Sequence, residues 1–304
     1  MQRRTFLAAS SAALALNPKL LADTPMPMSN LGQTGMRVSR ITVGGYHMRV
    51  RSQDEGVRIV HRAIDLGVNL FDCAHLYHDG KSEETYGVAL VGGLRQKIHL
   101  MTKAEIYTYD GAFKELEESL TRMKTDYLDL WCCHQVSTMS EVDQILGPRG
   151  SLQAFVKAKE QGKVRHIGFT GHYDPEVHLR MLRSFDGWET VQHPVNLVDP
   201  YHLSFIGNVL PKVREKGLGM LAMKSNAMGG ISEHHIAPIS ECLRFTWSQD
   251  IDTLVSGVET VQQLEENVLA CKTFRKMTGP EMTTLLNRTK KGPVGAEVEK
   301  YKKA

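Results

Sequence analysis

The chain has 304 residues, of which 41% are hydrophobic and 23% are charged, a composition typical of a globular protein. Its formal net charge of +3 is too small to indicate a nucleic acid or an anionic membrane surface as a partner. The length fits one α/β barrel of about 250 residues together with a leader and a tail.

The chain begins with two arginines followed by an apolar run. Arg3 and Arg4 precede residues 6–16, which are too few to span a membrane as a stable helix. This start resembles a twin-arginine export signal, although two positions depart from the consensus. We therefore predict an export signal over residues 1–22, the twin-arginine export machinery as a partner, and a periplasmic or exported bacterial protein. The alternative is a disordered or amphipathic arm on a cytoplasmic protein.

Strand-like and helix-like segments alternate through the rest of the chain. A short hairpin with glycine at its turn is expected over residues 28–40. Eight strands are then expected, over residues 41–45, 69–74, 99–104, 127–134, 164–170, 190–196, 219–224 and 253–257. Helices are expected over residues 54–66, 83–90, 112–123, 151–161, 176–184, 203–216, 238–249 and 261–271.

Eight strand–helix units specify a (β/α)8 TIM barrel of the α/β class, preceded by the hairpin. We place this barrel at residues 23–272 and a C-terminal tail at residues 273–304. A doubly wound sheet is the alternative, but no Gly-x-Gly-x-x-Gly follows the first strand. The polar connection over residues 135–150 is long enough to reach over the mouth of the barrel.

Four titratable side chains lie at or just past the ends of three successive strands. They are Asp72, Tyr77, Lys103 and His134. Singly, each has an ordinary explanation, as a helix cap, a packing tyrosine, a solvated lysine or a structural histidine. Together they converge if the strands are parallel neighbours, because the carboxyl ends of barrel strands meet at one mouth.

The four side chains suit acid–base chemistry at a carbonyl group. A lysine ammonium beside a tyrosine favours the phenolate and lowers the tyrosine pKa from about 10. The aspartate would hold that lysine charged, and the histidine would orient the substrate oxygen. Such a set protonates a carbonyl oxygen while a hydride reaches the carbon, or oxidises an alcohol in reverse.

In order and context, these four residues resemble the catalytic set of the aldo-keto reductases, and the resemblance extends over about residues 28–270. It implies an NAD(P)-dependent oxidoreductase that interconverts a carbonyl compound and its alcohol, with Tyr77 as the proton donor. The substrate would be a small aldehyde or ketone, with sugar-like compounds among the candidates. The alternative is a non-catalytic binding or accessory protein built on the same barrel.

The resemblance also assigns residues to the cofactor, NAD(P)(H). Gln192 matches a glutamine that bonds the nicotinamide carboxamide. Thr170 keeps a hydroxyl in a motif where Gly171 replaces an amide side chain, a contact that His172 would take over. Glu266 and Asn267 match residues that hold the adenine. The complete predicted set is Gly45, Thr170, Gln192, Lys224, Gly257, Glu259, Gln263, Glu266 and Asn267.

The adenosine end of this set favours NAD(H). No basic residue stands at 257–260 or 263, where family members place groups for the 2′-phosphate of NADP. Glu259 would repel a phosphate and accept hydrogen bonds from a free ribose diol. Because free cofactor is not ordinarily regenerated outside the cytoplasm, an exported enzyme is expected to hold its cofactor tightly through alternating oxidation and reduction.

The five cysteines are odd in number and lack the spacing of a zinc site. We predict that all five are buried free thiols and that there is no metal site. Metal-dependent hydrolysis has little support, because the histidines are scattered and Lys103 would repel a divalent cation.

Overall fold

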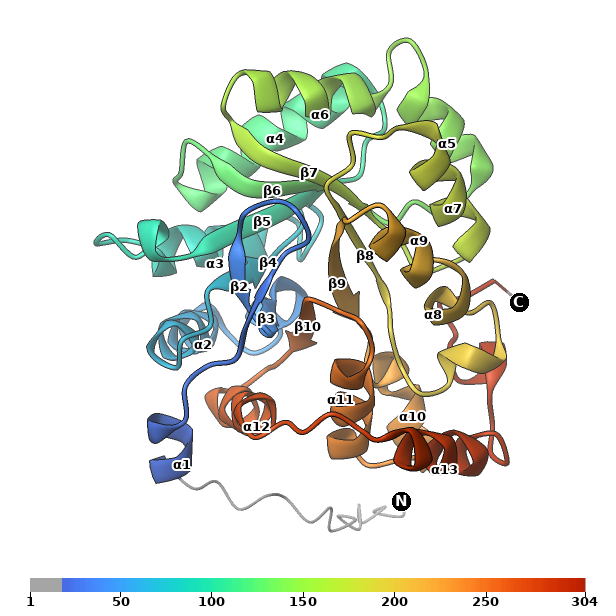
Figure 1. Cartoon of the computed structure of the whole chain (residues 1–304). Helices are drawn as coiled ribbons and strands as arrows, with labels where there is room; N and C mark the ends of the chain where they lie inside the picture. The colour runs from blue at the N-terminus through green and yellow to red at the C-terminus, as the bar shows by residue number, and fades with distance from the viewer. Residues whose placement is uncertain (1–17, 304) are drawn as a thin grey trace, which may run out of the picture.

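The computed structural model describes residues 18–303, so the predicted leader arginines, Arg3 and Arg4, lie outside the described residues. Its centre is a closed barrel of strands that are parallel to both neighbours (Figure 1). The strands are β3 (Ile41–Gly44), β4 (Leu70–Asp72), β5 (His99–Ala104), β6 (Leu128–Cys133), β7 (Val164–Thr170), β8 (Thr190–Pro194), β9 (Gly219–Met223) and β10 (Thr253–Gly257). They run around the barrel in chain order, and β10 pairs with β3 to close it. The predicted (β/α)8 fold is confirmed.

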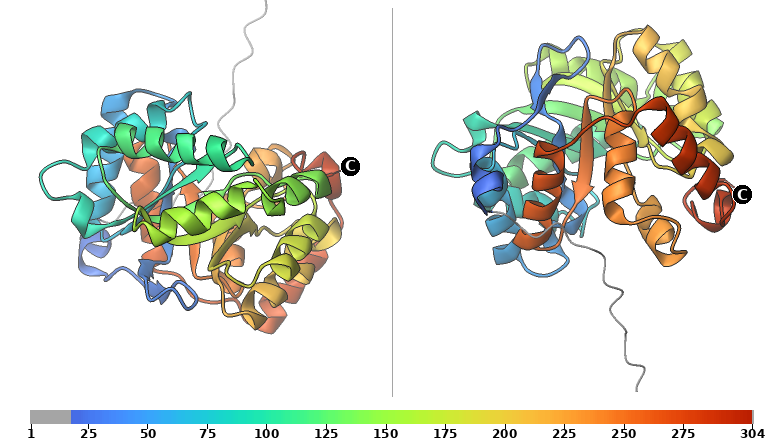
Figure 2. Two further views of the ribbon diagram at one scale, coloured as in Figure 1. Left: turned by 90° about the horizontal axis from the view of Figure 1, so that it is seen from above. Right: turned by 60° about the horizontal axis from the view of Figure 1, so that its bottom comes forward.

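Helices return the chain between strands and cover the outside of the barrel, as Figure 2 shows from two sides. They include α2 (Gln53–Asp65), α3 (Lys81–Ala89), α4 (Tyr109–Met123), α6 (Ser151–Glu160), α7 (Pro175–Ser184), α8 (Phe205–Asn208), α9 (Leu210–Glu215), α11 (Ile239–Ser248) and α12 (Val261–Lys272). Several of these helices are capped at the N-terminus by a hydroxyl side chain. Ser52, Thr108 and Thr260 accept hydrogen bonds from backbone amides of α2, α4 and α12, respectively. These caps satisfy amides that have no partner inside the helix.

The interior of the barrel is a packed core. An antiparallel hairpin of β1 (Met28–Asn30) and β2 (Arg37–Ser39) contributes to it, which confirms the predicted hairpin. The hairpin covers the end where strands begin, because Gly32 and Ser39 donate to Asp252 and Asn69, just before β10 and β4. The buried interior cluster comprises Leu31, Met36, Val38, Leu70, Met101, Leu130, Cys132 and Leu221. The hairpin does not cover the opposite end of the barrel, where the strands finish.

After the hairpin, three helices lie in segments for which the sequence predicted none. They are α5 (Met139–Leu146) within the polar connection, α10 (Gly230–Glu233) after β9, and α13 (Gly279–Thr289) in the tail. α5 begins with a capping box between Thr138 and Glu141, which is a signal that the sequence carried. The helix expected over residues 203–216 is two short helices, α8 and α9, because Pro211 has no amide hydrogen to continue a single ladder.

The C-terminal tail packs on the barrel. Leu285, Val298 and Tyr301 share a buried cluster with Leu197 and Phe245. In Figure 1 the red C-terminal end lies beside α8, and the His202 side chain contacts the Lys303 carbonyl oxygen at 2.7 Å. The tail therefore returns to the loops that follow β7 and β8.

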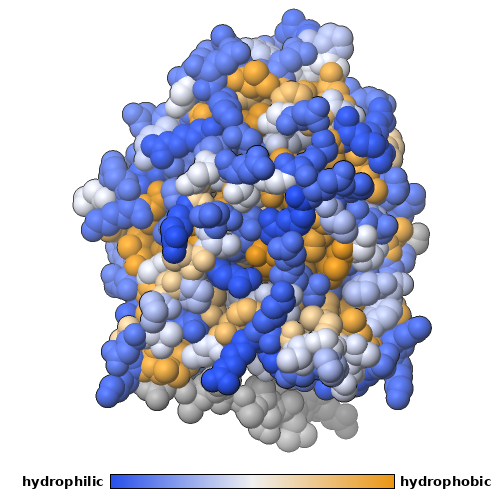
Figure 3. Space-filling view, viewed as in Figure 1, coloured by the Kyte–Doolittle hydropathy of each residue, from blue (hydrophilic) through white to orange (hydrophobic). Residues whose placement is uncertain are grey.

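The cysteines are buried, and the surface is largely hydrophilic on the face drawn in Figure 3. Cys73, Cys132, Cys133, Cys242 and Cys271 are buried free thiols, as predicted. Within residues 18–303, no helix is long and apolar enough to cross a membrane. On the face drawn in Figure 3, hydrophilic residues cover much of the surface and break up the apolar areas between them.

A short helix before the hairpin joins the N-terminal segment to the barrel. α1 (Pro18–Asp23) lies against α12, and the Lys272 Nζ donates to the Leu21 carbonyl oxygen at 2.8 Å. The Leu21 side chain is only 2% exposed and belongs to the main core cluster. The predicted export signal, residues 1–22, thus overlaps a helix that packs on the body of the protein.

Replacing Leu21 with alanine is expected to lower the free energy of unfolding by about 2–4 kcal/mol, because it removes a buried side chain and leaves a cavity. Leu20, on the same helix, is 40% exposed, and Leu20→Ala should change that free energy by less than about 1 kcal/mol. Urea unfolding followed by circular dichroism measures both. Equal losses for the two variants would show that α1 does not dock through Leu21.

Candidate active site

The barrel brings the four predicted catalytic residues together at its mouth. Asp72 is the last residue of β4, Lys103 is the penultimate residue of β5, and His134 follows β6. Tyr77 lies in the turn after β4, where its ring centroid is 5.5 Å from that of His134 and 5.1 Å from the Lys103 Nζ. The sequence expectation that strand ends would gather these side chains is met.

Asp72 and Lys103 form a buried ion pair. The Lys103 Nζ donates to the Asp72 carboxylate and to the Cys73 carbonyl oxygen, the latter at 2.6 Å. Burial raises the pKa of Asp72, and Lys103 opposes that rise. Burial lowers the pKa of Lys103, but Asp72 and Tyr77 outweigh it and hold the pKa above its ordinary value. The lysine is therefore charged at neutral pH.

The pKa of Tyr77 differs from the sequence-based prediction. Burial raises the pKa of its phenol well above the ordinary value, while the nearby Lys103 charge lowers that pKa. The lysine thus acts in the predicted direction, but the prediction of a lowered pKa is wrong for this structure. Removal of the phenol from water costs more than one ammonium already paired with Asp72 can offset. Tyr77 is protonated at neutral pH.

His134 is neutral and lies near a carboxylate. Burial, followed by the charges of Lys103 and Lys224, brings the pKa of His134 well below its usual value. Its Nδ1 lies 2.8 Å from the Glu105 Oε1, a contact that the sequence gave no reason to expect. Glu105 is two residues beyond Lys103 on the same strand end, so the two charged groups flank the mouth. A neutral imidazole can donate or accept a hydrogen bond to a substrate oxygen.

The nicotinamide end of the predicted cofactor site has a free acceptor. The Gln192 side chain hydrogen-bonds Asp72, while its Oε1 is buried and has no hydrogen-bond partner among the described residues. A buried carbonyl oxygen without a donor fits the amide of a nicotinamide carboxamide. Gly45 also contacts Asp72 through its backbone amide, and a Cβ there would collide with the Asp72 carbonyl oxygen. The Thr170 Oγ1 accepts from the Gln135 amide at 3.1 Å, and its hydroxyl hydrogen remains available to donate.

The adenosine end lies around the start of α12. Gln263 accepts from the Glu259 amide at 2.8 Å, and Asn267 donates to Ser256 at 3.0 Å. Glu266 accepts from Gln262 at 2.9 Å. Gly257 is exposed at the end of β10, where a Cβ would meet the ring of His47. These predicted residues lie on one surface, with Glu259 at its edge.

Two basic residues reach this surface from the other end of the chain. The His47 Nδ1 and the Arg51 Nε lie 3.7 and 3.6 Å from the two oxygens of Glu259. His47 is in η1 (Gly45–Arg49), and Arg51 precedes α2. The inference that no base is available here considered only residues 257–260 and 263. It is incomplete, because β10 and β3 are neighbours only in the closed barrel.

The tail supplies a second set of residues that the sequence did not single out. Lys302, which is buried, contacts Asp199 at 2.7 Å and Glu299 at 2.8 Å. Asn196, just after β8, donates to Glu299 and to the Tyr301 hydroxyl, each at 2.9 Å. A run of polar and charged residues at a chain end gives no signal of burial, so this anchor could not be read from the sequence.

His172 and Lys224 lie beside Tyr301 of that tail. The His172 Nδ1 is 3.3 Å from the Tyr301 carbonyl oxygen, and the Lys224 Nζ lies 5.1 Å from the centre of the Tyr301 ring. Burial and Lys224 lower the pKa of His172 to about 4. The mouth thus has one wall made by β7, β9 and the chain terminus.

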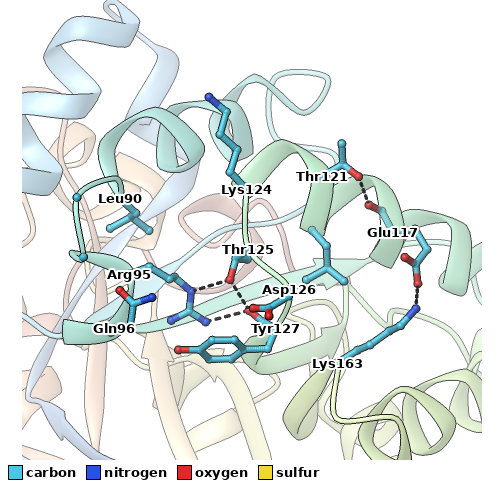
Figure 4. Close-up of a pocket in the computed structure, with 13 residues that line it drawn as sticks. Leu90, Arg95, Gln96, Glu117, Thr121, Lys124, Thr125, Asp126, Tyr127 and Lys163 are labelled. Carbon is cyan, nitrogen blue, oxygen red and sulfur yellow. Dashed lines mark hydrogen bonds and ion pairs between the residues drawn. The ribbon is translucent and has the colours of Figure 1, made fainter.

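A polar groove at the opposite end of the barrel has no part in this site. It is lined by Arg95, Gln96, Lys124, Asp126, Tyr127 and Lys163 among others, all before or between strand starts (Figure 4). Arg95 is already paired with Asp129 at 2.9 Å, and Lys163 with Glu117. Two of its cations, Arg95 and Lys163, are therefore already paired within the protein.

Comparison with known proteins identifies the family. The model of the aldo/keto reductase family matches residues 40–239. The chain belongs to the aldo/keto reductase family. L-galactose dehydrogenase from Arabidopsis thaliana is 25% identical, over 86% of this chain and 93% of its own. 6-Dehydroglucose reductase from Novosphingobium aromaticivorans is 30% identical, over 52% of this chain and 56% of its own.

The fold is shared with solved members. The aldo-keto reductase AKR11C1 from Bacillus halodurans, in its holo form, matches with a TM-score of 0.75 at 21% identity. The match covers 86% of this chain and 96% of that chain. As an aldo/keto reductase the protein is an oxidoreductase, and NAD(P)(H) is the cofactor of its family.

Lys103→Met is expected to lower the free energy of unfolding by about 3–5 kcal/mol at pH 7, because Asp72 is left buried without a counter-charge. The double variant Asp72→Asn/Lys103→Met should be more stable than Lys103→Met alone, since it also removes the stranded carboxylate. Urea unfolding of the wild type, both single variants and the double variant gives the coupling free energy between the Asp72 and Lys103 side chains. Additive losses would contradict a buried pair.

Proposed function

We propose that this aldo/keto reductase interconverts a small carbonyl compound and its alcohol, with Tyr77 as the proton donor to the carbonyl oxygen. The observation that carries the proposal is the buried Asp72–Lys103 pair beside Tyr77, with His134 across the mouth. A bound NAD(P)H supplies the hydride in reduction, and NAD(P) accepts it in oxidation.

Each residue of the set has a separable task. Tyr77, protonated at neutral pH, gives its proton to the substrate oxygen as negative charge develops there. Lys103 stabilises the resulting phenolate, and its charge is kept by Asp72. His134, neutral and beside Glu105, holds the same oxygen by a hydrogen bond and so fixes the carbonyl for attack.

A sugar-like substrate suits the mouth. The two relatives named for L-galactose and 6-dehydroglucose act on sugars by those names. In this chain the mouth is lined by polar groups from several strands, including Glu105, His134, His172 and Lys224. Hydroxyl-rich molecules offer donors and acceptors for such groups, whereas an apolar aldehyde would leave them unsatisfied.

The proposal for the cofactor is a preference for NAD(H). It is supported by Glu259, whose carboxylate would repel a 2′-phosphate and accept from a ribose diol. Arg51, 3.6 Å from Glu259 and more than half exposed, is the residue that would meet a 2′-phosphate if the preference were reversed. Gln192 would hold the nicotinamide carboxamide through its unpartnered Oε1.

Export by the twin-arginine route forms the last part of the proposal. It rests on Arg3 and Arg4 before an apolar run. Because that route carries folded proteins, the cofactor would load in the cytoplasm and remain bound in the periplasm. One substrate would then be oxidised and another reduced in turn without release of the cofactor.

Tyr77→Phe is expected to lower kcat/KM for aldehyde reduction by about 10²–10⁴-fold, because it removes the general acid and little else. Cofactor affinity should stay within about twofold, since the hydroxyl is not needed for cofactor binding. The matched control is Tyr46→Phe, whose ring lies edge-on to that of Tyr77 at 5.4 Å and which should retain activity. Steady-state NADH consumption and fluorescence titration measure the two quantities.

Retained turnover in Tyr77→Phe would exclude Tyr77 as the donor. Cofactor binding without turnover in the wild type, over a panel of neutral and anionic sugars, would favour the non-catalytic barrel instead.

The protein, expressed with its leader and purified from the periplasm of the expressing bacterium, is expected to release stoichiometric NAD rather than NADP on denaturation. Tight binding before export is the physical reason, and mass spectrometry of the released nucleotide is the measurement. The control variant Arg3→Lys/Arg4→Lys should remain in the cytoplasm. Released NADP would reverse the cofactor preference, and periplasmic recovery of the double-lysine variant would contradict twin-arginine export.

A further inference from the structure

Lys224 occupies an unusual position at the end of β9. Its φ of 56° is in the left-handed region, as are those of Ala227 and Met228 shortly after it. Side chains other than glycine adopt this conformation at a cost, which functional sites tolerate more often than other regions do. The turn directs the Lys224 Nζ to within 3.2 Å of the Met228 Sδ and over the Tyr301 ring.

Within residues 18–303, the charge of Lys224 has no carboxylate partner. Among the described residues, no carboxylate oxygen lies within 4.0 Å of its Nζ, and its recorded partners are a thioether and an aromatic ring. Two buried lysines at this end of the barrel, Lys103 and Lys302, are each held by carboxylates. A half-buried ammonium with only soft partners is poorly compensated and would gain from an anion.

That charge acts on the catalytic side of the mouth. It lowers the pKa values of both His134 and His172. Burial and the charge of Lys103 in turn lower the pKa of Lys224 to about 8. Because such charge effects decline with distance, Lys224 lies within electrostatic range of Lys103 and His134. Glu259 and Gly257, which mark the adenosine end, lie past the end of the neighbouring strand β10.

We propose that Lys224 binds an anionic group of the substrate, a carboxylate or phosphate on a sugar-like carbonyl compound, with Tyr301 as the adjoining wall. This inference rests on the proposed function and adds the substrate class. It gives Lys224 a different task from the cofactor contact expected from the sequence. His172, fixed by the Tyr301 carbonyl oxygen, completes the same wall.

The tail holds this wall in place. Tyr301 receives a hydrogen bond from Asn196 on its hydroxyl and donates to Glu299 at 2.7 Å. Lys302, next in the chain, is anchored by Asp199. Lys224 therefore packs on a ring that is fixed at both its hydroxyl and its backbone. An anion reaching Lys224 would meet a preorganised cation rather than a mobile surface lysine.

The test uses gluconate and sorbitol, an anionic and a neutral polyol of equal carbon number, with the NAD-loaded full-length protein. Isothermal titration calorimetry at pH 7 should show gluconate binding about tenfold or more tightly than sorbitol, since a charged partner strengthens the hydrogen bond. Lys224→Met should abolish that difference, and Lys224→Arg should keep it. Equal binding of the two polyols by the wild type would overturn the proposal.

A pH series distinguishes the contribution of Lys224 to gluconate binding from that of other cations. The groups that face it are Lys103 on β5, His134 after β6, His172 after β7 and Tyr301 in the tail. With a pKa of about 8, Lys224 loses its charge as the pH rises from 7 to 9, so the gluconate preference should fall in that range. Lys224→Arg, which stays charged, should hold the preference to pH 9. A preference that falls equally in both proteins would exclude Lys224 as its source.

The pyrophosphate of the cofactor is the alternative anionic partner for Lys224. If Lys224 binds the cofactor pyrophosphate, gluconate will compete with NADH for the protein. Lys224→Met will then weaken NADH binding, and the variant will bind gluconate and sorbitol with equal affinity. That result would overturn the substrate assignment. None of these readouts needs turnover, so failure of the Tyr77 experiment and failure of this one are distinguishable.

Discussion

The ion pair between Asp72 and Lys103 is the interaction on which the rest of the site depends. Both side chains are buried, so each would be too costly to keep charged without the other. They come from adjacent parallel strands, β4 and β5, and only the barrel register brings them to the same level of the mouth. The pair keeps a permanent cation beside Tyr77, which otherwise lies in surroundings that strongly oppose its ionisation. In the proposed reaction, this lysine stabilises the phenolate as the proton leaves Tyr77.

A second constraint comes from the end of the chain. Lys302 is buried between Asp199 and Glu299, and this cluster ties the tail to the loop after β8. Tyr301, next to it, reaches both His172 and Lys224. The mouth is thus assembled from the strand ends on one side and from the last residues of the chain on the other. Removal of the tail would open the wall without touching the catalytic residues.

The sequence allowed the barrel and the meeting of the four candidate catalytic residues to be predicted because both depend on local patterns. Apolar runs that end in a polar residue, such as those before Asp72 and His134, mark strand ends, and parallel strands place those ends together. The resemblance to the aldo-keto reductases added the roles and the cofactor residues.

Other features required the three-dimensional structure. Arg51 meets Glu259 only because the first and last strands close the barrel, a contact between residues more than 200 positions apart. The raised pKa of Tyr77 follows from burial, which no spacing of residues reveals. The anchoring of Glu299 and Lys302 was equally hidden, since charged residues near a terminus are ordinarily solvated. Each of these depends on packing between distant segments.

The central claim is that the paired lysine and Tyr77 serve hydride transfer between the cofactor and a small carbonyl compound. Its most direct test is deuterium transfer from [4-²H]NADH and [4-²H]NADPH to a panel of neutral and anionic sugar aldehydes, read by mass spectrometry of the alcohols formed. We expect one deuterium on the new carbinol carbon with the wild-type protein. Absence of deuterium in every alcohol, from protein shown to bind the cofactor, would contradict it.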